Sequence, residues 1–400
     1  MRPRSRASFV SDRVLVIAFL AFVTLPLVGT PLGWDFYEVQ ENRRPTPFPD
    51  LATTTLPELP DAFDAYYRDH FGFRNFFIRR WNRLLRRLDK NLLRRVIQGR
   101  DQWLYYDRPD LILDYLGRLE TKDEDLEYWR SAIEGRQSWL ADRGIHYLFA
   151  VAPNKLSIYP EMLPEDLQAA ARPTRLDLLV EYMEAHSDVQ VLDIRPAMRA
   201  EKDWKTLYLS NDTHWNGYGA FIAYRTVVSR LREQLPELDP ALELSECRVV
   251  SGPHYGDLAR HADLPTSEYT ITNVTIDPPT IEGFETSELS DPVFTPGRVW
   301  PGGNMAPPVY RCPSGHGRAV VFHDSFFLTA TKLFAHHFAE STNIWHEVTP
   351  EALTAVVEKQ KPDVVVEVVA ERTLHRLPEQ FGEWEEARRR RHGTDTSKAD

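Results

Sequence analysis

The stretch that decides the fold is RAVVFHDSFFLTATKLFAHHFAESTNIWHEVTPEALTAVVEKQKPDVVVEVV, residues 318–369. Its apolar runs predict three strands: Arg318–Phe322, Asn343–Val348 and Asp363–Val369. Two helical patterns separate them: Phe326–Phe338 and Glu351–Lys359. Because Asp363–Val369 reads as one apolar run, it is typical of a strand buried inside a parallel sheet. This alternation predicts an α/β fold, a parallel sheet flanked by helices.

The alternation continues toward the N-terminus. Two further strands are predicted at His146–Val151 and Val189–Ile194. Helices are predicted at Asp123–Arg143, Thr174–Ala185 and Gly217–Gln234. Residues 236–317 instead hold many prolines and glycines, with short β-like pieces such as Tyr269–Ile276. We therefore expect an irregular β-rich insertion over 236–317 that walls a cleft, inside a domain that spans 99–377.

The N-terminus predicts a membrane anchor. Residues 1–13 carry Arg2, Arg4, Arg6 and Arg13, and an apolar run over 14–31 follows. Such a run with basic residues before it is typical of an uncleaved signal anchor, a single transmembrane helix with its basic end in the cytoplasm. Everything beyond it would lie outside the inner membrane. Residues 32–98 are predicted to form a stem and an amphipathic helical segment, and 378–400 a polar tail.

Composition excludes some functions. The 400 residues carry a net charge of -11, which argues against nucleic acid as a partner. Cys247 and Cys312 have no metal-ligand spacing, so no zinc site is expected from them. In an exported domain they could form one disulfide, and two unpaired thiols are the alternative.

The first candidate site is Ser210-Asn211-Asp212-Thr213-His214-Trp215-Asn216. Asp212 and His214 are two residues apart, so in an extended segment their side chains point the same way. A carboxylate beside an imidazole fixes its tautomer and stabilises the imidazolium that forms during catalysis. A capping Asp with a surface His explains the pattern equally well, and so does a metal site.

The second candidate site is Val320-Val321-Phe322-His323-Asp324-Ser325-Phe326-Phe327. An apolar strand ends there and Ser325 opens a predicted helix, which would place its hydroxyl at the carboxyl edge of the sheet. The N-terminus of that helix would offer N–H groups and a positive dipole end to an oxyanion. Helix capping by Ser325 or Asp324 is the simpler alternative.

Three further groups are expected near the same edge or in the insertion. Asn154 and Lys155 follow the strand that ends near Val151 and could contact the substrate or support the site. Glu371 and Arg372 end the last strand and could border the cleft, or form a surface ion pair. Within the insertion, three residues are possible metal ligands: His254, Asp257 and His261. No metal is expected there, because common loop residues produce such spacings by chance.

These pieces together resemble the alginate O-acetyltransferase family of AlgJ and AlgX, whose catalytic domains are SGNH-hydrolase-like. Asp212-Thr213-His214-Trp215 matches its Asp-x-His-Trp signature, and Asp324-Ser325-Phe326 its serine turn. The weaker matches are Phe71-Gly72-Phe73-Arg74, Trp103-Leu104-Tyr105, Pro153-Asn154-Lys155 with Ile158-Tyr159-Pro160-Glu161, and Tyr255-Gly256-Asp257-Leu258. Asp and His precede Ser, the permuted order of this family. His323 stands where Gly is common.

The resemblance implies a Ser-His-Asp triad made of Ser325, His214 and Asp212. Candidates for oxyanion or substrate contacts are Asn154, Lys155, Trp215, Tyr255 and Arg372, with the backbone N–H of Ser325. No cofactor is expected. The implied function is extracytoplasmic O-acetylation of an exported polysaccharide through an acyl-serine, with a multi-spanning membrane acyltransferase supplying the acetyl group. Three alternatives stay open: a carbohydrate O-acetylesterase with the same triad, a non-catalytic polysaccharide-binding or assembly protein, and a metal hydrolase built on His214, Asp212 and His254.

Overall fold

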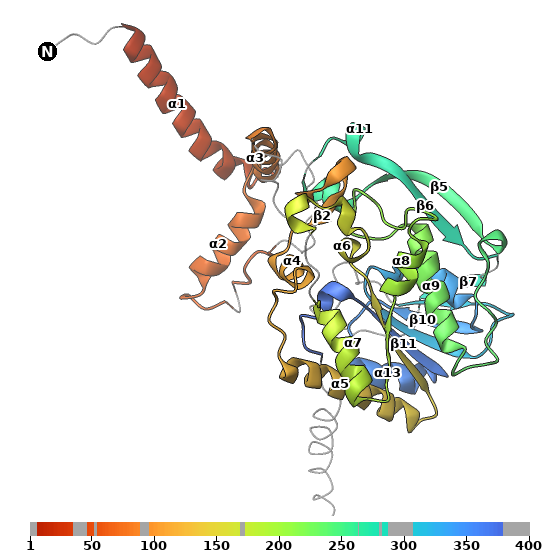
Figure 1. Ribbon diagram of the computed structural model, residues 1–400. Coiled ribbons are helices and arrows are strands. Elements are labelled where there is room, and N and C mark those ends of the chain that lie inside the picture. The colour runs from red at the N-terminus through yellow and green to blue at the C-terminus, as the bar shows by residue number, and fades with distance from the viewer. Residues whose placement is uncertain are drawn as a thin grey trace, which may run out of the picture. The chain divides into compact units, whose positions relative to one another are not determined.

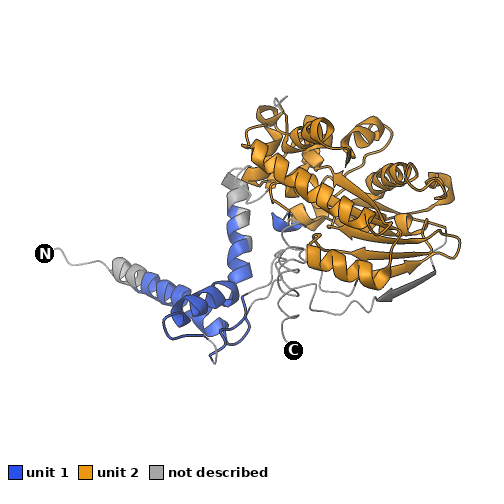
Figure 2. Cartoon of the chain, turned by 90° about the horizontal axis from the view of Figure 1, so that it is seen from below, with its two compact units in different colours: residues 1–94, 260–264 blue, residues 95–259, 265–400 orange. Residues whose placement is uncertain are grey.

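The computed structural model describes residues 6–34, 46–51, 54–88, 96–168, 173–262, 264–279, 282–286 and 307–378. The chain divides into two compact units, Met1–Arg94 with Arg260–Leu264, and Arg95–Ala259 with Pro265–Asp400 (Figure 2). Much of the predicted stem and all but one residue of the predicted tail lie outside the described residues.

The larger unit is built on a seven-stranded sheet in the order β4-β3-β11-β9-β10-β8-β7 (Figure 1). Five strands run parallel: β4 (Val191–Asp193), β3 (His146–Ala152), β11 (Val364–Ala370), β9 (Arg318–His323) and β10 (Glu340–Ile344). Two antiparallel strands extend one edge: β8 (Pro308–Arg311) and β7 (Glu282–Thr286). The predicted insertion therefore adds two strands, β7 and β8, to the edge of the main sheet.

Helices cover both faces of the sheet, as the alternation predicts. Successive strand residues point to opposite faces, so Leu148 and Ala150 of β3 join one buried cluster, and Tyr147 and Phe149 the other. The first cluster includes side chains of α8 (Arg195–Glu201), α9 (Gly217–Leu231) and α12 (Thr331–Ala335). The second includes side chains of α5 (Asp123–Ala141), α7 (Arg175–His186) and α13 (Pro350–Gln360). This confirms the α/β fold.

Shorter elements complete this unit. A small hairpin pairs β1 (Val96–Gln98) with β2 (Leu104–Tyr106), and a longer one pairs β5 (Arg248–Tyr255) with β6 (Thr270–Asp277). The short α-helices are α4 (Pro109–Tyr115), α6 (Lys155–Ile158), α10 (Asp257–His261) and α11 (Thr266–Tyr269). Cys247 and Cys312 are not bonded to each other in the structure.

The run that forms β11 is interrupted by a buried acid. Glu367 accepts hydrogen bonds from Arg136 of α5 at 2.9 and 3.1 Å and from the Tyr147 hydroxyl at 2.6 Å. A buried carboxylate needs such partners because an unpaired charge inside a protein is costly. Glu367 therefore ties α5 to two neighbouring strands of the sheet.

The segment after Ser325 differs from the predicted helix Phe326–Phe338. Residues 325 and 326 form a turn, and a 3-10 helix, η6 (Phe327–Ala330), then leads into α12. A four-residue 3-10 helix has a much smaller summed dipole than a long α-helix. The predicted long-helix dipole at Ser325 is therefore wrong, and any oxyanion donors must be individual N–H groups.

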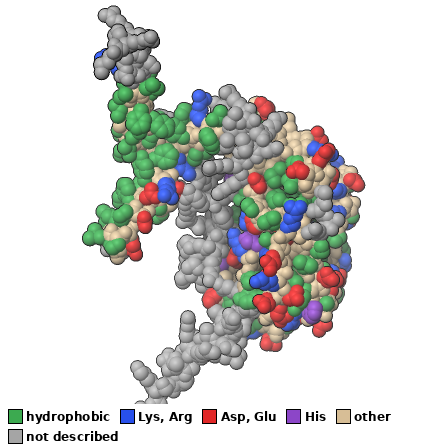
Figure 3. All heavy atoms as spheres, turned by 60° about the vertical axis from the view of Figure 1, so that its left-hand side comes forward, with side chains coloured by type: hydrophobic (Ala, Val, Ile, Leu, Met, Phe, Trp, Pro, Cys, Tyr) green, Lys and Arg blue, Asp and Glu red, His purple; other side chains and the backbone are tan. Residues whose placement is uncertain are grey.

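The smaller unit is helical. It contains α1 (Arg6–Gly29), α2 (Leu59–His70) and α3 (Arg74–Leu88), with Gly72 in the short segment between α2 and α3. Hydrophobic side chains gather along it (Figure 3), including exposed Ile17, Phe19 and Leu20 of α1. Within the described residues, no helix has both the length and the apolar character needed to cross a membrane.

Candidate active site

The ends of β9 and β3 carry predicted site residues to one edge of the sheet. Ser325 follows β9, and Asn154 follows β3. Carboxyl ends of parallel strands share an edge, and ligands bind there in open α/β sheets. Asp212 and His214 lie in the loop before α9. The structure brings Ser325, His214 and Asp212 together.

Hydrogen bonds join these three side chains in series. His214 Nε2 lies 2.8 Å from Ser325 Oγ, and His214 Nδ1 lies 2.7 Å from Asp212 Oδ1. The loop is a turn rather than the expected extended segment. Asp212 Oδ1 therefore also accepts the backbone N–H of His214, at 3.0 Å. With Nδ1–H donated to Asp212, Nε2 is left to accept the Ser325 hydroxyl proton.

The second carboxylate oxygen of Asp212 also has two polar partners. Oδ2 lies 3.0 Å from His254 Nε2 and accepts the backbone N–H of Asp257 at 2.9 Å. Burial by itself would raise the pKa of Asp212, but the hydrogen bonds from His214 and His254 hold that pKa well below its usual range. Asp212 is therefore an anion at neutral pH, fixed at both oxygens.

The electrostatic surroundings of His214 favour its protonated form. Burial lowers the pKa of His214, but the hydrogen bond and charge of Asp212, with the charge of Asp257, outweigh burial and raise that pKa above its usual value. An imidazole stabilised as imidazolium is suited to take a proton from Ser325 and return it later.

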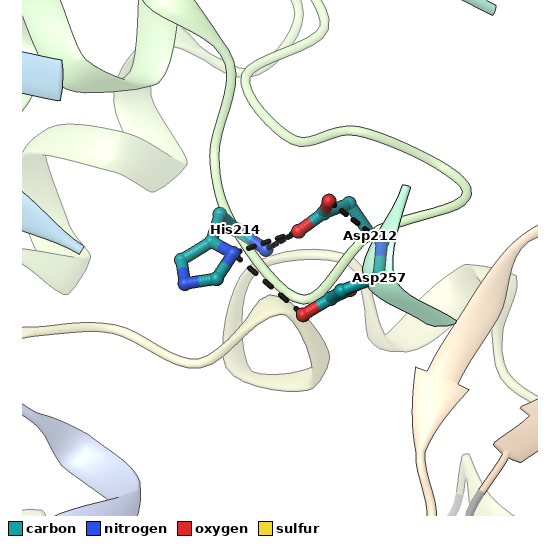
Figure 4. Close-up of side chains that lie close together, drawn as sticks. All are labelled: Asp212, His214 and Asp257. Atoms are coloured by element: carbon teal, nitrogen blue, oxygen red, sulfur yellow. Dashed lines mark hydrogen bonds and ion pairs between the residues drawn. The ribbon is translucent and has the colours of Figure 1, made fainter. Parts of the chain in front are cut away.

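Asp257 is a second carboxylate beside His214 (Figure 4). It accepts the backbone N–H of Thr213 at 2.8 Å and the Thr213 hydroxyl at 2.6 Å, and its Oδ2 lies 3.8 Å from His214 Nδ1. Ligand atoms of Asp212, His214 and Asp257 all lie within 4.8 Å of one another, a donor set that could hold a cation. All three side chains already form the hydrogen bonds described above, and His254 contacts Asp212.

The insertion reaches the site because Gly256 allows a close approach. A Cβ at Gly256 would lie 2.2 Å from the backbone oxygen of Asn211. The Asn211 side chain donates to the backbone oxygens of His254 and Tyr269, at 3.1 and 2.7 Å. The β5–β6 hairpin and the loop that carries Asp212 therefore form one packed structure.

Phe326, the residue after the serine, organises the aromatic side of the site. Its ring centroid lies 5.0 Å from that of His214 and 5.2 Å from that of Trp215. Arg372 Cζ lies 4.8 Å from the same ring centroid. Within the described residues, the Arg372 guanidinium forms no hydrogen bond or ion pair, although its charge acts on both His214 and Asp324.

The other predicted contact residues differ in their access to a substrate. Trp215 is 1% exposed and donates its indole N–H to Thr329, so it supports the site from within. Lys155 is also buried, with its amine bound to backbone oxygens. Tyr255 is half-buried and donates its hydroxyl to the Ala259 oxygen. The Glu371 carboxylate accepts a hydrogen bond from the backbone N–H of Asn154. In the sheet, β11 lies between β3, which precedes Asn154, and β9, which precedes Ser325.

Hydrogen bonds hold the two residues before Ser325 in place. Asp324 accepts the N–H groups of Phe326 and Ala370, at 2.8 and 2.7 Å. His323 is buried with Nδ1 2.7 Å from the Asp324 oxygen, and burial lowers the pKa of His323 to about 4. His323 is therefore neutral and belongs to the core beneath the serine turn.

Sequence reasoning missed the supporting roles of Asp257, Asn211 and Phe326. Asp257 lies in the motif Tyr255-Gly256-Asp257-Leu258, whose pattern indicates a family match and possible metal ligands but no contact with His214. A polar residue directly after a glycine in an otherwise irregular segment was the available signal. Asn211 and Phe326 stand inside the two candidate stretches, but nothing local indicated their contacts with the insertion and with His214.

Comparison with known proteins gives the same fold. A family model described as an SGNH hydrolase-like domain of acetyltransferase AlgX matches residues 96–295. The solved structure of Bacillus cereus PatB1 superposes with a TM-score of 0.52 at 15% identity, and covers 72% of this chain and 98% of that one.

Two relatives extend the comparison. The probable alginate O-acetylase AlgJ of Pseudomonas fluorescens is 27% identical over 214 residues, 52% of this chain and 51% of that protein. The protein of the same name from Pseudomonas aeruginosa is 27% identical over 298 residues, 71% of each chain. The chain thus spans about half the length of the first relative.

The sheet and the site at its carboxyl edge define an SGNH-hydrolase-like α/β protein. The chain belongs to the AlgJ/AlgX-like acetyltransferase family, whose domain model it matches over half its length.

Proposed function

We propose that this protein is a serine-dependent O-acetyltransferase that acetylates an exported polysaccharide of the alginate type. The observation that carries the proposal is the continuous hydrogen-bonded series Asp212–His214–Ser325. The names of the relatives supply the acceptor class: alginate O-acetylase is what both AlgJ proteins are called.

In the first half-reaction Ser325 takes the acetyl group. Its Oγ attacks the carbonyl carbon of the acetyl donor while His214 Nε2 accepts the hydroxyl proton. Asp212 stabilises the imidazolium that results. The tetrahedral intermediate collapses, the bond to the donor oxygen breaks, and His214 returns the proton to that leaving oxygen. The product is acetyl-Ser325.

In the second half-reaction a sugar hydroxyl replaces the donor. His214 removes the proton of that hydroxyl, whose oxygen attacks the acetyl-Ser325 carbonyl. The ester bond to Ser325 Oγ breaks and Oγ recovers a proton from His214. The Ser325 backbone N–H and the Asn154 side chain are the proposed oxyanion donors, each typically contributing about 10²–10³ in rate.

Arg372 is the proposed contact for acidic sugars. A guanidinium binds carboxylates in bidentate fashion, and that of Arg372 lies over Phe326, next to the nucleophile. Its charge has no direct ion pair within the described residues. An acceptor made of uronic acids would supply the missing anion. Tyr255 remains a proposed substrate contact at the insertion side.

We further propose that the protein works outside the inner membrane, anchored by its N-terminal segment. Exposed apolar side chains on α1 support this proposal. Acetyl-CoA is not present outside the membrane, so a multi-spanning acyltransferase would pass the acetyl group across.

One assay separates the competing functions. The full-length protein is given a chromogenic acetyl ester with and without uronate oligosaccharides, and both ester loss and acetylated sugar are followed by mass. A transferase produces acetylated sugar, whereas an esterase produces only acetate. Loss of activity in Ser325→Ala supports the serine mechanism. Loss of activity with a chelator, together with wild-type activity in Ser325→Ala, would support the metal alternative. A wild-type protein that neither hydrolyses the ester nor acetylates the sugar would support a binding role.

A further inference from the structure

Lys155 occupies an unusual position for a lysine directly beneath the candidate active site. It is the first residue of α6 and only 5% exposed. Its Nζ donates to the backbone oxygens of Asp212, Leu209 and Ser210, at 2.6, 2.9 and 3.3 Å. An ammonium group has three N–H donors, so all are directed at the turn that carries Asp212.

Aromatic rings complete the environment of this ammonium. Its Nζ lies 5.5 Å from the Trp103 ring centroid and 5.2 Å from that of Tyr105, both in the β1–β2 hairpin region. A cation within about 6 Å of a ring face is stabilised by the ring quadrupole. The same hairpin holds the turn directly, because Leu104 N–H donates to the Ser210 oxygen at 2.8 Å.

We infer that Lys155 is a positioning residue of the active site, whose ammonium group fixes the Leu209–Asp212 turn so that Asp212 orients His214. This inference rests on the proposed function. One cation binds three carbonyl oxygens of the same turn, and one of these belongs to Asp212 itself. A neutral amine has only two N–H groups and a lone pair, so one carbonyl would lose its donor and face that lone pair.

The protonation state of Lys155 therefore controls the turn. Burial lowers the pKa of Lys155 to about 7, against the opposing charges of Asp212 and Asp257. The turn is held fully below that pH and is released as pH rises through it. Activity should accordingly fall on the alkaline side near neutrality.

Other ionisable groups surround the same region: Asp212, His214, Asp257, Tyr105, Tyr208 and Glu371. Burial raises the pKa of both tyrosines, which stay neutral. Asp212 stays ionised, as described above. Burial raises the pKa of Glu371 to about 7, so Glu371 also titrates near neutrality, and the pKa of His214 is shifted upward as described above. Removing Lys155 alone separates its contribution from theirs.

The test compares Lys155→Met with Lys202→Met in the full-length protein. Lys202 also donates to a backbone oxygen, that of Ile158, and lies 5.4 Å from a tyrosine ring, but it is not bound to the Asp212 turn. The rate of a chromogenic acetyl ester is measured from acid to alkaline pH. A 1 Å displacement of a catalytic group can cost about 10² in rate, so a loss of about that size in kcat is expected in Lys155→Met.

The pH profile identifies the cause. Wild type and Lys202→Met should show a narrow bell, and Lys155→Met only the rising limb. Ethylamine should restore activity to Lys155→Ala by supplying an ammonium in the cavity. Lys155→Met with near wild-type kcat and an unchanged descending limb would overturn the inference, and so would absence of amine rescue in folded Lys155→Ala.

Two controls keep the result interpretable. If the Lys155 variants do not fold, the His214 ring resonances of the wild-type protein are followed against pH by NMR. A second inflection that coincides with the descending limb supports the inference, and a single inflection contradicts it. Ser325→Ala that keeps full activity would remove the proposed function itself. Inactive Ser325→Ala beside a normal Lys155→Met would remove only the role of Lys155.

Discussion

Among single residues, Asp212 has the most interactions in the site. Its two oxygens contact His214, His254 and the Asp257 N–H, while its backbone oxygen binds Lys155. A carboxylate with several donors is held ionised and in one orientation. Its orientation in turn fixes the ring of His214, so the geometry of the nucleophile depends on Asp212.

Asp212→Asn should lower kcat by about 10⁴-fold, because the amide favours the wrong tautomer of His214. Asp257→Asn is the matched control, since Asp257 lies 3.8 Å from the same ring nitrogen without a hydrogen bond to it. Steady-state kinetics on the acetyl ester measures both. An equal loss in the two variants would show that Asp212 has no special role.

The rising limb of the pH profile should belong to His214. Only neutral imidazole can accept the Ser325 proton, and Asp212 and Asp257 raise the pKa of His214. The value of kcat/KM should therefore increase with pH through a midpoint above about 6.5, the ordinary histidine value. A midpoint clearly below that value would contradict this electrostatic account.

Arg372→Gln should reduce the preference for acidic acceptors. A hydrogen bond to a charged group contributes about 1.5–3 kcal/mol, so the ratio of kcat/KM for a uronate oligosaccharide to that for its carboxyl-reduced form should fall about 10–100-fold. Mass-resolved transfer assays give this ratio. An unchanged ratio, with equal losses on both acceptors, would assign Arg372 to the oxyanion instead.

At the level of elements, the β5–β6 hairpin is part of the site because its end packs on the Asp212 turn. Gly256→Ala should destabilise the protein by about 1–3 kcal/mol and lower kcat, because the new Cβ would meet the Asn211 oxygen. Gly252→Ala in the same hairpin is the control, since its Cβ would have no neighbour within 4 Å. Thermal unfolding and kinetics should separate the two, and identical behaviour would contradict the packing argument.

Local sequence patterns could predict the strands and the serine turn, since apolar periodicity and strand-end placement are local properties. That Asp212, His214 and Ser325 would meet followed only from the resemblance to the family, because helix capping explained each motif by itself. Local patterns could not predict the turn conformation at residues 211–214 or the short 3-10 helix after Ser325. Those depend on contacts distant in sequence, such as Lys155 with Asp212 and Asp324 with Ala370.

The same limit explains Glu367 and Trp215. An acid inside an apolar strand is stable only because Arg136 and Tyr147 meet it, and both lie more than 200 residues away. Trp215 is in the family signature, which suggested a substrate contact, yet its ring packs against Phe326. Sequence motifs identify such residues without saying which side of the site they occupy.

For the whole molecule, we predict that α1 retains the protein in the membrane. Ile17→Arg with Leu20→Arg should shift the full-length protein from the membrane to the soluble fraction, because each arginine replaces an exposed apolar side chain of α1 that would be buried against lipid. Leu113→Arg with Val249→Arg, also at exposed apolar positions, is the control. Alkaline extraction of membranes measures the distribution. Wild-type protein found wholly in the soluble fraction would contradict anchoring.

The central claim is that acetyl transfer passes through Ser325. The most direct measurement is a rapid acid quench of the full-length protein with a chromogenic acetyl ester, followed by peptide mass spectrometry. The account predicts one acetyl group on the peptide that contains Ser325, absent in Ser325→Ala, and transferred to sugar when a uronate oligosaccharide is added. Acetylated sugar formed at the wild-type rate by Ser325→Ala would contradict it.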